Sequence, residues 1–287
     1  MLALASVFWG AHWVMARAIS SQVTPIAMSF WRWAIAMAIL APFAWGPLVR
    51  DRAKILAAWP QVLFFGTIGT VVYNALTYLG LRDSTATNGL LMQSLIPVLI
   101  PLFAWLIFRD RIRALTVAGI VLSLSGVLCI AFRLDPEAAA AFRFAPGDPW
   151  LFANVTLWAL YTACLRWTPK GVHPLSMFYA VMAAGMLTGI PAFLLERAAG
   201  GGIDWTPAVT AAIVYMGAFP SAVCFLLWNR GVELLGPSRS GPFIHLTPVS
   251  GILMAWLFLD ERLHDYHLVG IALIVTGLVL ASRGKHA

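Results

Sequence analysis

The sequence predicts an all-α polytopic membrane protein with ten transmembrane helices arranged as two inverted five-helix repeats. Three observations support this fold class. The 287 residues are 61% apolar and 11% charged, whereas a soluble domain carries about 25% charged residues. The apolar residues form ten long runs with short polar linkers between them. Two stretches of the chain, 151 positions apart, match one another without a gap.

The ten apolar runs each approach the length of about 20 residues that a helix needs to cross a bilayer. They are unbroken rather than alternating, which excludes the strands of a membrane β-barrel. Backbone groups in lipid must be hydrogen-bonded within their own segment, so the runs are expected to be helices. In chain order the expected spans are residues 2–18, 26–47, 61–80, 86–108, 114–133, 149–167, 174–195, 207–229, 238–259 and 266–282.

The internal repeat is clearest between residues 95–128 and 246–279, where 12 of 34 aligned positions are identical. A Pro, a Trp, an Arg and two Gly recur in phase, and shared composition alone would not produce this. In the first two spans of each half the offset becomes 149, so Trp9 pairs with Trp158. The domain organisation predicted from these matches is a first repeat at 1–133, a linker at 134–148 and a second repeat at 149–287.

The direction of the spans follows from the number in each repeat and from the basic residues. Five is odd, so the second repeat is expected to cross the membrane in the opposite sense to the first. Of the 19 Lys and Arg residues, 12 fall on the side that holds both termini, 6 on the other side and Arg32 within the second span. Positive charge collects on cytoplasmic loops, so both termini are predicted to be cytoplasmic in a plasma (bacterial inner) membrane.

Several motifs occur once in each repeat. The fourth and ninth spans each contain a Pro, each is followed by an acidic residue, and the fifth and tenth each carry Gly-x6-Gly; the residues are Pro97, Pro248, Asp110, Glu261, Gly119, Gly126, Gly270 and Gly277. With Arg32 in the second span, this pattern over the whole chain resembles the ten-helix EamA-type family of the drug/metabolite transporter superfamily. The chain looks most like its aromatic amino acid exporter branch, although Asp110 replaces the more usual Glu.

The resemblance implies a carrier that exports small amphipathic metabolites, with aromatic and other apolar amino acids as the expected substrates. Inverted repeats suit alternating access around a site near the midplane of the bilayer. The expected partners are a small-molecule substrate and the lipid bilayer. The net charge of +7 is explained by the cytoplasmic loops, so no nucleic acid is expected. The protein is expected to act as a monomer without a cofactor or metal.

Polar and aromatic residues at membrane depth are the candidate binding groups, because such polar groups are costly unless they have a partner or a function. The rings are expected to stack on the solute, and the amide and imidazole groups to hold its polar end. The predicted substrate-binding residues are Trp9, His12, Trp13, Asn74, Tyr78, Gln93, Trp158, Tyr161, Asn229 and His245. The alternative for each is ordinary helix packing or a helix–helix hydrogen bond.

Prolines in the fourth and ninth spans are candidate hinges, because a proline removes a hydrogen bond from the helix interior. The predicted gating residues are Pro97, Pro101, Pro248 and Gly251; a static bend is the alternative. The paired Gly119/Gly126 and Gly270/Gly277 are expected to let two helices pack closely.

The acidic residues all fall in loops or near span ends. Coupling to protons would therefore run through His12 or His245, or else the protein is a facilitator driven by the solute gradient. A multidrug exporter of the same fold is the alternative function. An ion channel is disfavoured because rings of charge or a carbonyl filter are not visible. No GxSxG or HExxH signature occurs, so an enzyme is not expected.

Overall fold

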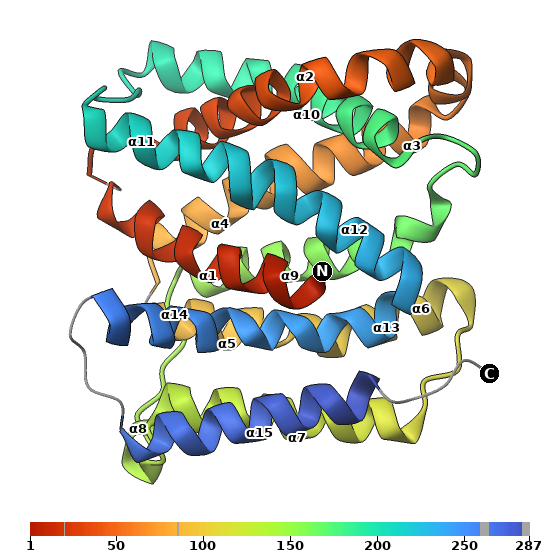
Figure 1. Ribbon diagram of the computed structural model, residues 1–287. Coiled ribbons are helices and arrows are strands. Elements are labelled where there is room, and N and C mark those ends of the chain that lie inside the picture. The colour runs from red at the N-terminus through yellow and green to blue at the C-terminus, as the bar shows by residue number, and fades with distance from the viewer. Residues whose placement is uncertain (20, 85, 259–263, 283–287) are drawn as a thin grey trace.

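Helices make up the regular structure of the chain in the computed structural model (Figure 1). The structure describes residues 1–287 except 20, 85, 259–263 and 283–287, and the side chains of some further positions, Trp13 and Tyr78 among them, also lie outside the description. Within the described ranges the only strand-like pairing is an isolated bridge between Val23 and Ile203. The predicted all-α chain is therefore confirmed for these residues.

The helices follow one another in the same order in the two halves of the chain. The first half contains α1 (Leu2–Ala18), α2 (Pro25–Ala57), α3 (Trp59–Gly66), the π-helical η1 (Thr67–Val72), α4 (Tyr73–Arg82), α5 (Ala86–Gln93), α6 (Ile96–Phe108) and α7 (Ala114–Phe132), followed by the short α8 (Pro136–Ala140). The second half contains α9 (Asp148–Cys164), η2 (Leu165–Trp167), α10 (Pro174–Ala198), α11 (Pro207–Met216), the π-helical η3 (Gly217–Val223), α12 (Cys224–Leu235), α13 (Pro237–Ser240), η4 (Gly241–His245), α14 (Leu246–Phe258) and α15 (Asp265–Ser282).

Six helices of the described chain are long and apolar enough to cross a membrane, which agrees with a multi-pass membrane protein. They are Pro25–Ala57, Leu91–Phe108, Ala114–Phe132, Pro174–Ala198, Pro207–Leu235 and Asp265–Ser282. The other four predicted spans fall on α1, on α3–η1–α4, on α9 and on α13–η4–α14. The count of ten spans stays a prediction.

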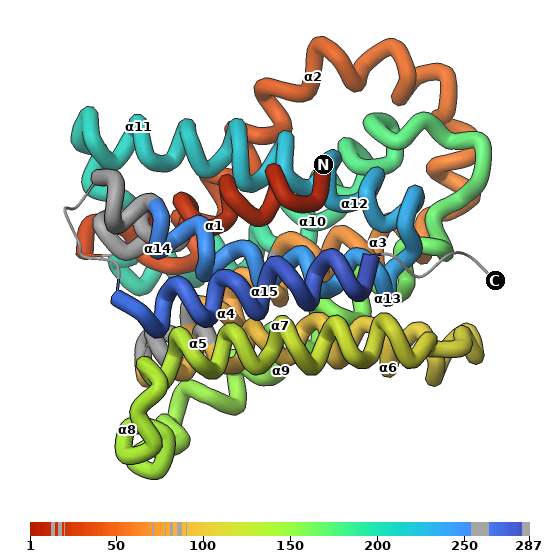
Figure 2. Tube along the Cα trace, turned by 60° about the horizontal axis from the view of Figure 1, so that its bottom comes forward, coloured from red at the N-terminus to blue at the C-terminus, as the bar shows by residue number. Residues whose placement is uncertain are grey.

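Helix α2 differs from the expected span, which ended at residue 47. The helix continues to Ala57, and Figure 2 shows it as an arch over the rest of the bundle. Pro42 and Pro47 lie inside it, and prolines bend helices without necessarily ending them. The added turns carry charge but also bury Asp51 and Ile55, so contacts with the neighbouring helix explain why the helix extends past its apolar run.

Two spans are interrupted by π-helical segments at matching places, η1 and η3. In η3 the cause is Pro220, which cannot donate a backbone hydrogen bond. Nearby side chains take up carbonyls that this geometry frees. The Ser221 hydroxyl donates to the Met216 carbonyl over 2.9 Å, and the Thr70 hydroxyl in η1 donates to the Gly66 carbonyl. π-Helical bulges of this kind are frequent at functional sites.

The bundle places α2 beside α10 at one edge and α7 beside α15 at the opposite edge, with the other helices between them (Figure 1). The pairs between these edges include α4 with α9, α1 with α12, α6 with α9, and α1 with α14. Each pair joins a helix of the first half to one of the second. The interior of the bundle is therefore built jointly by both halves.

The α7–α15 pair depends on four glycines. A Cβ atom at Gly119 would lie 2.5 Å from the Gly277 carbonyl oxygen, and one at Gly126 would lie 2.6 Å from the Gly270 carbonyl oxygen. Both distances are too short for a real contact, so the two backbones touch where the side chains are missing. The prediction that these glycines permit close packing is confirmed.

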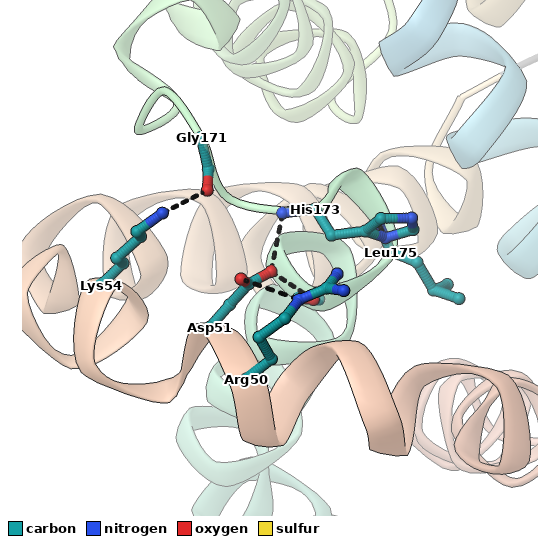
Figure 3. A network of polar contacts seen from close by, with 7 residues as sticks. Arg50, Asp51, Lys54, Gly171, His173 and Leu175 are labelled. Carbon is teal, nitrogen blue, oxygen red and sulfur yellow. Dashed lines mark hydrogen bonds and ion pairs between the residues drawn. The ribbon is translucent and has the colours of Figure 1, made fainter.

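In the α2–α10 pair, the N-terminus of each helix is hydrogen-bonded by a carboxylate of the other helix. Asp51 near the end of α2 accepts hydrogen bonds from the His173 backbone N–H over 2.8 Å and from the Ser176 hydroxyl over 3.0 Å, at the start of α10 (Figure 3). Glu196 near the end of α10 accepts from the backbone N–H groups of Ile26 and Ala27 over 3.0 and 2.7 Å, at the start of α2. Each carboxylate satisfies helix N-terminal donors and lies at the positive end of the helix dipole.

Glycine replacement tests the α7–α15 contact. Gly126→Ala would force two backbones apart, and such overpacking destabilises by about 1–3 kcal/mol, so the melting temperature of the purified protein should fall. Gly46→Ala is the matched control, because a Cβ there meets nothing within 4 Å; it should leave the melting temperature unchanged or raise it. An equal effect of the two substitutions would contradict the packing role.

The reciprocal caps predict a crossed pattern in hydrogen exchange. Glu196→Ala should speed exchange of the Ile26 and Ala27 amides on α2, and Asp51→Ala should speed exchange of the His173 amide before α10. Glu233→Ala, which removes an exposed ion pair with Arg230, is the control. Mass spectrometry of peptides from each helix gives the readout. If exchange became faster only in the helix that carries the substitution, the carboxylates would not stabilise the N-terminus of the partner helix.

Candidate functional site

Aromatic side chains from α1, α4, α9 and α12 form a buried cluster around Trp158. Its ring centroid lies 5.4 Å from that of Trp9 and 5.4 Å from that of Phe225, both edge-on, and 5.1 Å from that of Tyr73. Tyr161 stacks on Trp158 at 5.3 Å with an interplanar angle of 17°. Rings at these spacings attract one another beyond simple burial. The cluster lies where both halves of the chain meet.

Trp228 on α12 completes this aromatic cluster. Its ring lies 5.4 Å from Trp9 and 6.0 Å from Trp158, and its side chain is fully buried. The indole N–H of Trp228 donates to the Thr162 hydroxyl over 3.4 Å. The indole N–H of Trp9 donates to the carbonyl of Pro220 over 3.1 Å, so the π-helical interruption in η3 supplies one of the acceptors of the cluster.

A buried polar group lies next to the cluster and centres on Arg32. Its guanidinium donates to the His12 Nε2 over 3.2 Å and to the Asn74 Oδ1 over 2.9 Å. Acceptance by Nε2 requires a neutral imidazole whose proton is on Nδ1. Asn74 directly follows Tyr73, which contacts Trp158, so the polar group and the aromatic cluster are neighbours. We call this polar group, His12, Arg32 and Asn74, the Arg32 group.

The Arg32 group is anchored to η1. The Asn74 amide donates to the Thr70 carbonyl, which lies in the π-helical segment. Arg32 is 5% exposed and Asn74 is 3% exposed, and a buried charge needs hydrogen bonds to be tolerated. Side chains from α1 and α4 supply the hydrogen bonds that hold Arg32.

Further hydrogen bonds join α9 to its neighbours. The Asn154 amide donates to the Tyr73 carbonyl over 2.6 Å and to the Thr77 hydroxyl over 2.7 Å, which ties α9 to α4. The Tyr161 hydroxyl donates to the Asn229 Oδ1 over 3.2 Å, which ties α9 to α12. Tyr161 and Asn229, both predicted as binding residues, therefore contact each other beside Trp158.

His245 lies apart from the contacts of Trp158. Its Nε2 donates to the Ser94 carbonyl over 3.1 Å, and its Nδ1 pairs with the Ser123 hydroxyl at 2.8 Å. Both ring nitrogens thus join η4 to other helices, and the side chain is 1% exposed. The role predicted for His245 in holding the polar end of a solute stays a prediction. Position along a helix does not show which neighbour a ring nitrogen meets.

The interruptions of the predicted fourth and ninth spans meet each other. The fourth breaks between α5 and α6, at residues 94–95, so Pro97 stands in the first turn of α6, where a proline is tolerated. A Cβ atom at Gly241, in η4 of the ninth span, would lie 3.1 Å from the Cα of Pro97. Gln93, at the end of α5, is next to this crossing and half buried.

The other predicted hinge residues fall inside helices. Pro101 lies within α6, and Pro248 and Gly251 lie within α14. A Cβ atom at Gly251 would meet nothing within 4 Å, so close packing does not require a glycine there. Their hinge role stays a prediction, and so do the binding roles of Trp13 and Tyr78, whose side chains lie outside the described residues.

The sequence interpretation missed several members of the site. Phe225 contacts Trp158, Trp9 and Trp33, yet it was not a candidate. The signal was present, since Phe225 precedes Trp228 and Asn229 by three and four residues and so shares their helix face. Phenylalanine has no polar atom, and only residues with a polar or indole group had been considered.

Comparisons with known proteins place this architecture in a family. The model of the EamA-like transporter family matches residues 1–132 and again 145–283. The chain belongs to the EamA-like transporter family. Members of this family are transporters and in general are not enzymes.

The relatives that match this chain over most of its length include the following two. The uncharacterized transporter YyaM of Bacillus subtilis (strain 168) is 26% identical over 277 residues, which cover 96% of this chain and 90% of YyaM. A protein of Streptantibioticus cattleyicolor named "probable terminal-alkyne amino-acid exporter" is 27% identical over 284 residues, which cover 98% of this chain and 92% of that protein.

The fold is also known from a solved structure. A crystal structure of a protein that is 20% identical superposes with a TM-score of 0.74 over 98% of this chain and 95% of that chain. At this identity the likeness concerns the fold alone.

The Arg32 group predicts a specific response to substitution of Asn74. Asn74→Leu removes an acceptor from a buried guanidinium, and an unsatisfied buried group costs about 1–3 kcal/mol, more for a charged one, so the melting temperature should fall. Asn74→Asp keeps an acceptor oxygen and should be tolerated better. If both variants melt at the same temperature, the Arg32–Asn74 contact does not stabilise the fold.

Proposed function

We propose that this EamA-family transporter exports small amphipathic metabolites, chiefly aromatic and other apolar amino acids, by alternating access. The observation that carries the proposal is the aromatic cluster around Trp158 beside the buried Arg32 group. An amino acid of this class combines an apolar body with charged ends. The site offers the matching pair of surfaces, rings for the body and polar groups for the ends.

The chemistry of the site is suited to binding a solute that has both apolar and polar parts. Binding sites are mostly apolar with a few placed polar groups, and polar residues within membrane spans usually mark a solute pathway. In the proposal the solute body packs among Trp9, Trp158 and Tyr161. Asn74 and Asn229 exchange their present hydrogen bonds for bonds to its polar end.

The relative from Streptantibioticus cattleyicolor supports an amino acid as the class of solute. Its printed name is that of an amino-acid exporter, and the match extends over nearly the whole of both chains. The choice of aromatic amino acids rests on the aromatic cluster and on the resemblance to the aromatic exporter branch.

The proposed mechanism uses ten spans in two inverted repeats. Its support is the repetition of features in the two halves. The π-helical η1 and η3 and the breaks near Ser94 and His245 lie at matching positions, and Asp51 and Glu196 make crossed caps near the ends of α2 and α10. Two antiparallel copies can exchange conformations, and this exchange would open the shared site to each side in turn. Both termini are proposed to face the cytoplasm, and the protein to act as a monomer in the plasma membrane.

Transport in proteoliposomes tests this function. Vesicles that contain only this protein should release preloaded labelled phenylalanine, tryptophan and leucine faster than vesicles without protein, while glutamate should stay inside. The same experiment with a pH gradient separates a facilitator, whose flux ignores the gradient, from a proton-coupled carrier. Absence of amino acid flux under both conditions would contradict the proposed substrates.

A further inference from the structure

Trp158, the central ring of the aromatic cluster, carries a buried donor that makes no hydrogen bond. Its side chain is 3% exposed, and its Nε1 has no hydrogen-bond partner among the described residues. The two indole groups beside it differ, since Trp9 donates to the Pro220 carbonyl and Trp228 to the Thr162 hydroxyl. Buried polar groups are nearly always hydrogen-bonded, and an exception calls for an explanation.

The surroundings of Trp158 explain why the donor stays unsatisfied. Its nearest ring neighbours include Trp9, Tyr73 and Phe225, and aromatic faces are at most weak acceptors. If the ring cluster served only stability, a phenylalanine at position 158 would be favoured, because an apolar aromatic side chain carries no unsatisfied donor. The N–H group thus weakens the closed cluster.

Comparison of the two repeats shows how Trp158 differs from Trp9 in its hydrogen bonding. Trp9 and Trp158 occupy matching positions, and the acceptor of Trp9 is Pro220 in η3. The position that matches Pro220 is Gly69 in η1, 151 residues earlier. A Cβ atom at Gly69 would lie 2.9 Å from the Tyr161 ring, so Tyr161 packs directly on this part of η1. Although Gly69 also has a backbone carbonyl, it accepts nothing from Trp158, whose Nε1 has no hydrogen-bond partner among the described residues.

Among the described residues, the buried indole N–H of Trp33 is also without a hydrogen-bond partner. Trp33 lines a cavity of about 40 Å³ between α2, η1 and α10, together with Ser29 and Thr70. A space of this size can hold water, which would satisfy the donor. Trp158 is not among the residues that line this cavity.

We propose that the indole N–H of Trp158 is the donor that recognises a hydrogen-bond acceptor on the solute, a carboxylate or carbonyl oxygen attached to an apolar body. This inference rests on the proposed function and specifies it. When the solute enters the aromatic cluster, its acceptor oxygen bonds the Trp158 N–H while its apolar body replaces ring contacts of Trp9 and Phe225. Solutes of the same shape without the acceptor gain only the ring contacts.

Binding of two matched probes tests the proposal. Phenylalanine and phenethylamine share the ring and the amino group, but only phenylalanine has the carboxylate. Trp158→Phe keeps an aromatic ring and removes the N–H. In binding measurements on purified protein, the smaller ring should weaken binding of both probes, and loss of the N–H should lower the ratio of the affinity for phenylalanine to that for phenethylamine about tenfold, which corresponds to about 1.4 kcal/mol.

Trp228→Phe is the matched control, because the Trp228 N–H already bonds Thr162. Its ratio of affinities for the two probes should equal that of the unchanged protein. Should Trp158→Phe fail to fold, replacement of Trp158 by benzothienylalanine, in which sulfur takes the place of the N–H in a ring of the same shape, gives the same comparison.

The outcomes separate the inference from the proposed function. An unchanged ratio in the Trp158 variants, with binding of phenylalanine by the unchanged protein, would overturn the role of the N–H and leave the proposed function standing. Failure of the unchanged protein to bind phenylalanine would overturn both. A lowered ratio in the Trp158 variants alone would support the inference.

Discussion

The bilayer interior offers no hydrogen bonds, and the rest of this structure depends on that constraint. A backbone or side-chain polar group at membrane depth is costly unless it finds a partner within the protein. Where the helical ladder is interrupted, side chains complete it: Ser221 bonds a carbonyl before η3, Trp9 bonds the Pro220 carbonyl, and His245 bonds the Ser94 carbonyl at the break between α5 and α6. Of these residues, Trp9 and His245 also join the two halves of the chain.

The contacts also divide the bundle into edges and an interior of different character. At the edges, backbone contact between α7 and α15 and the crossed caps of α2 and α10 hold regular helices side by side. In the interior, interrupted helices surround aromatic rings and a buried guanidinium. Contacts between aromatic rings can be replaced by contacts with a solute at little cost in stability. The backbone contacts between glycines of α7 and α15 cannot be replaced in this way. A carrier needs this combination, because the site must open while the frame around it stays folded.

The sequence predicted the helical class and the close packing of Gly119, Gly126, Gly270 and Gly277, because apolar run length and small-residue spacing report directly on membrane helices. It also placed Trp9, Trp158, Tyr161 and Asn229 at depth, and the structure brings these four together in one cluster.

Other parts of the site could not be predicted from the sequence, and the reason differs for each residue. Depth along a helix does not fix its rotation, so the contacts of His245 with Ser123 and Ser94 could not be predicted. Apolar Phe225 gave no polar signal, although it contacts three tryptophans. The partners of Arg32 come from helices far apart in sequence, and no local pattern specifies such a meeting.

The most direct test of the account asks whether the aromatic cluster is reached from both sides of the membrane and shared with the solute. A single cysteine at Phe225, in a variant whose Cys129, Cys164 and Cys224 are replaced by alanine, would be treated with a membrane-impermeant thiol reagent in right-side-out and in inverted vesicles. The account predicts labelling from either side and slower labelling from both when phenylalanine is present. Labelling from one side only, or labelling that phenylalanine leaves unchanged, would contradict it.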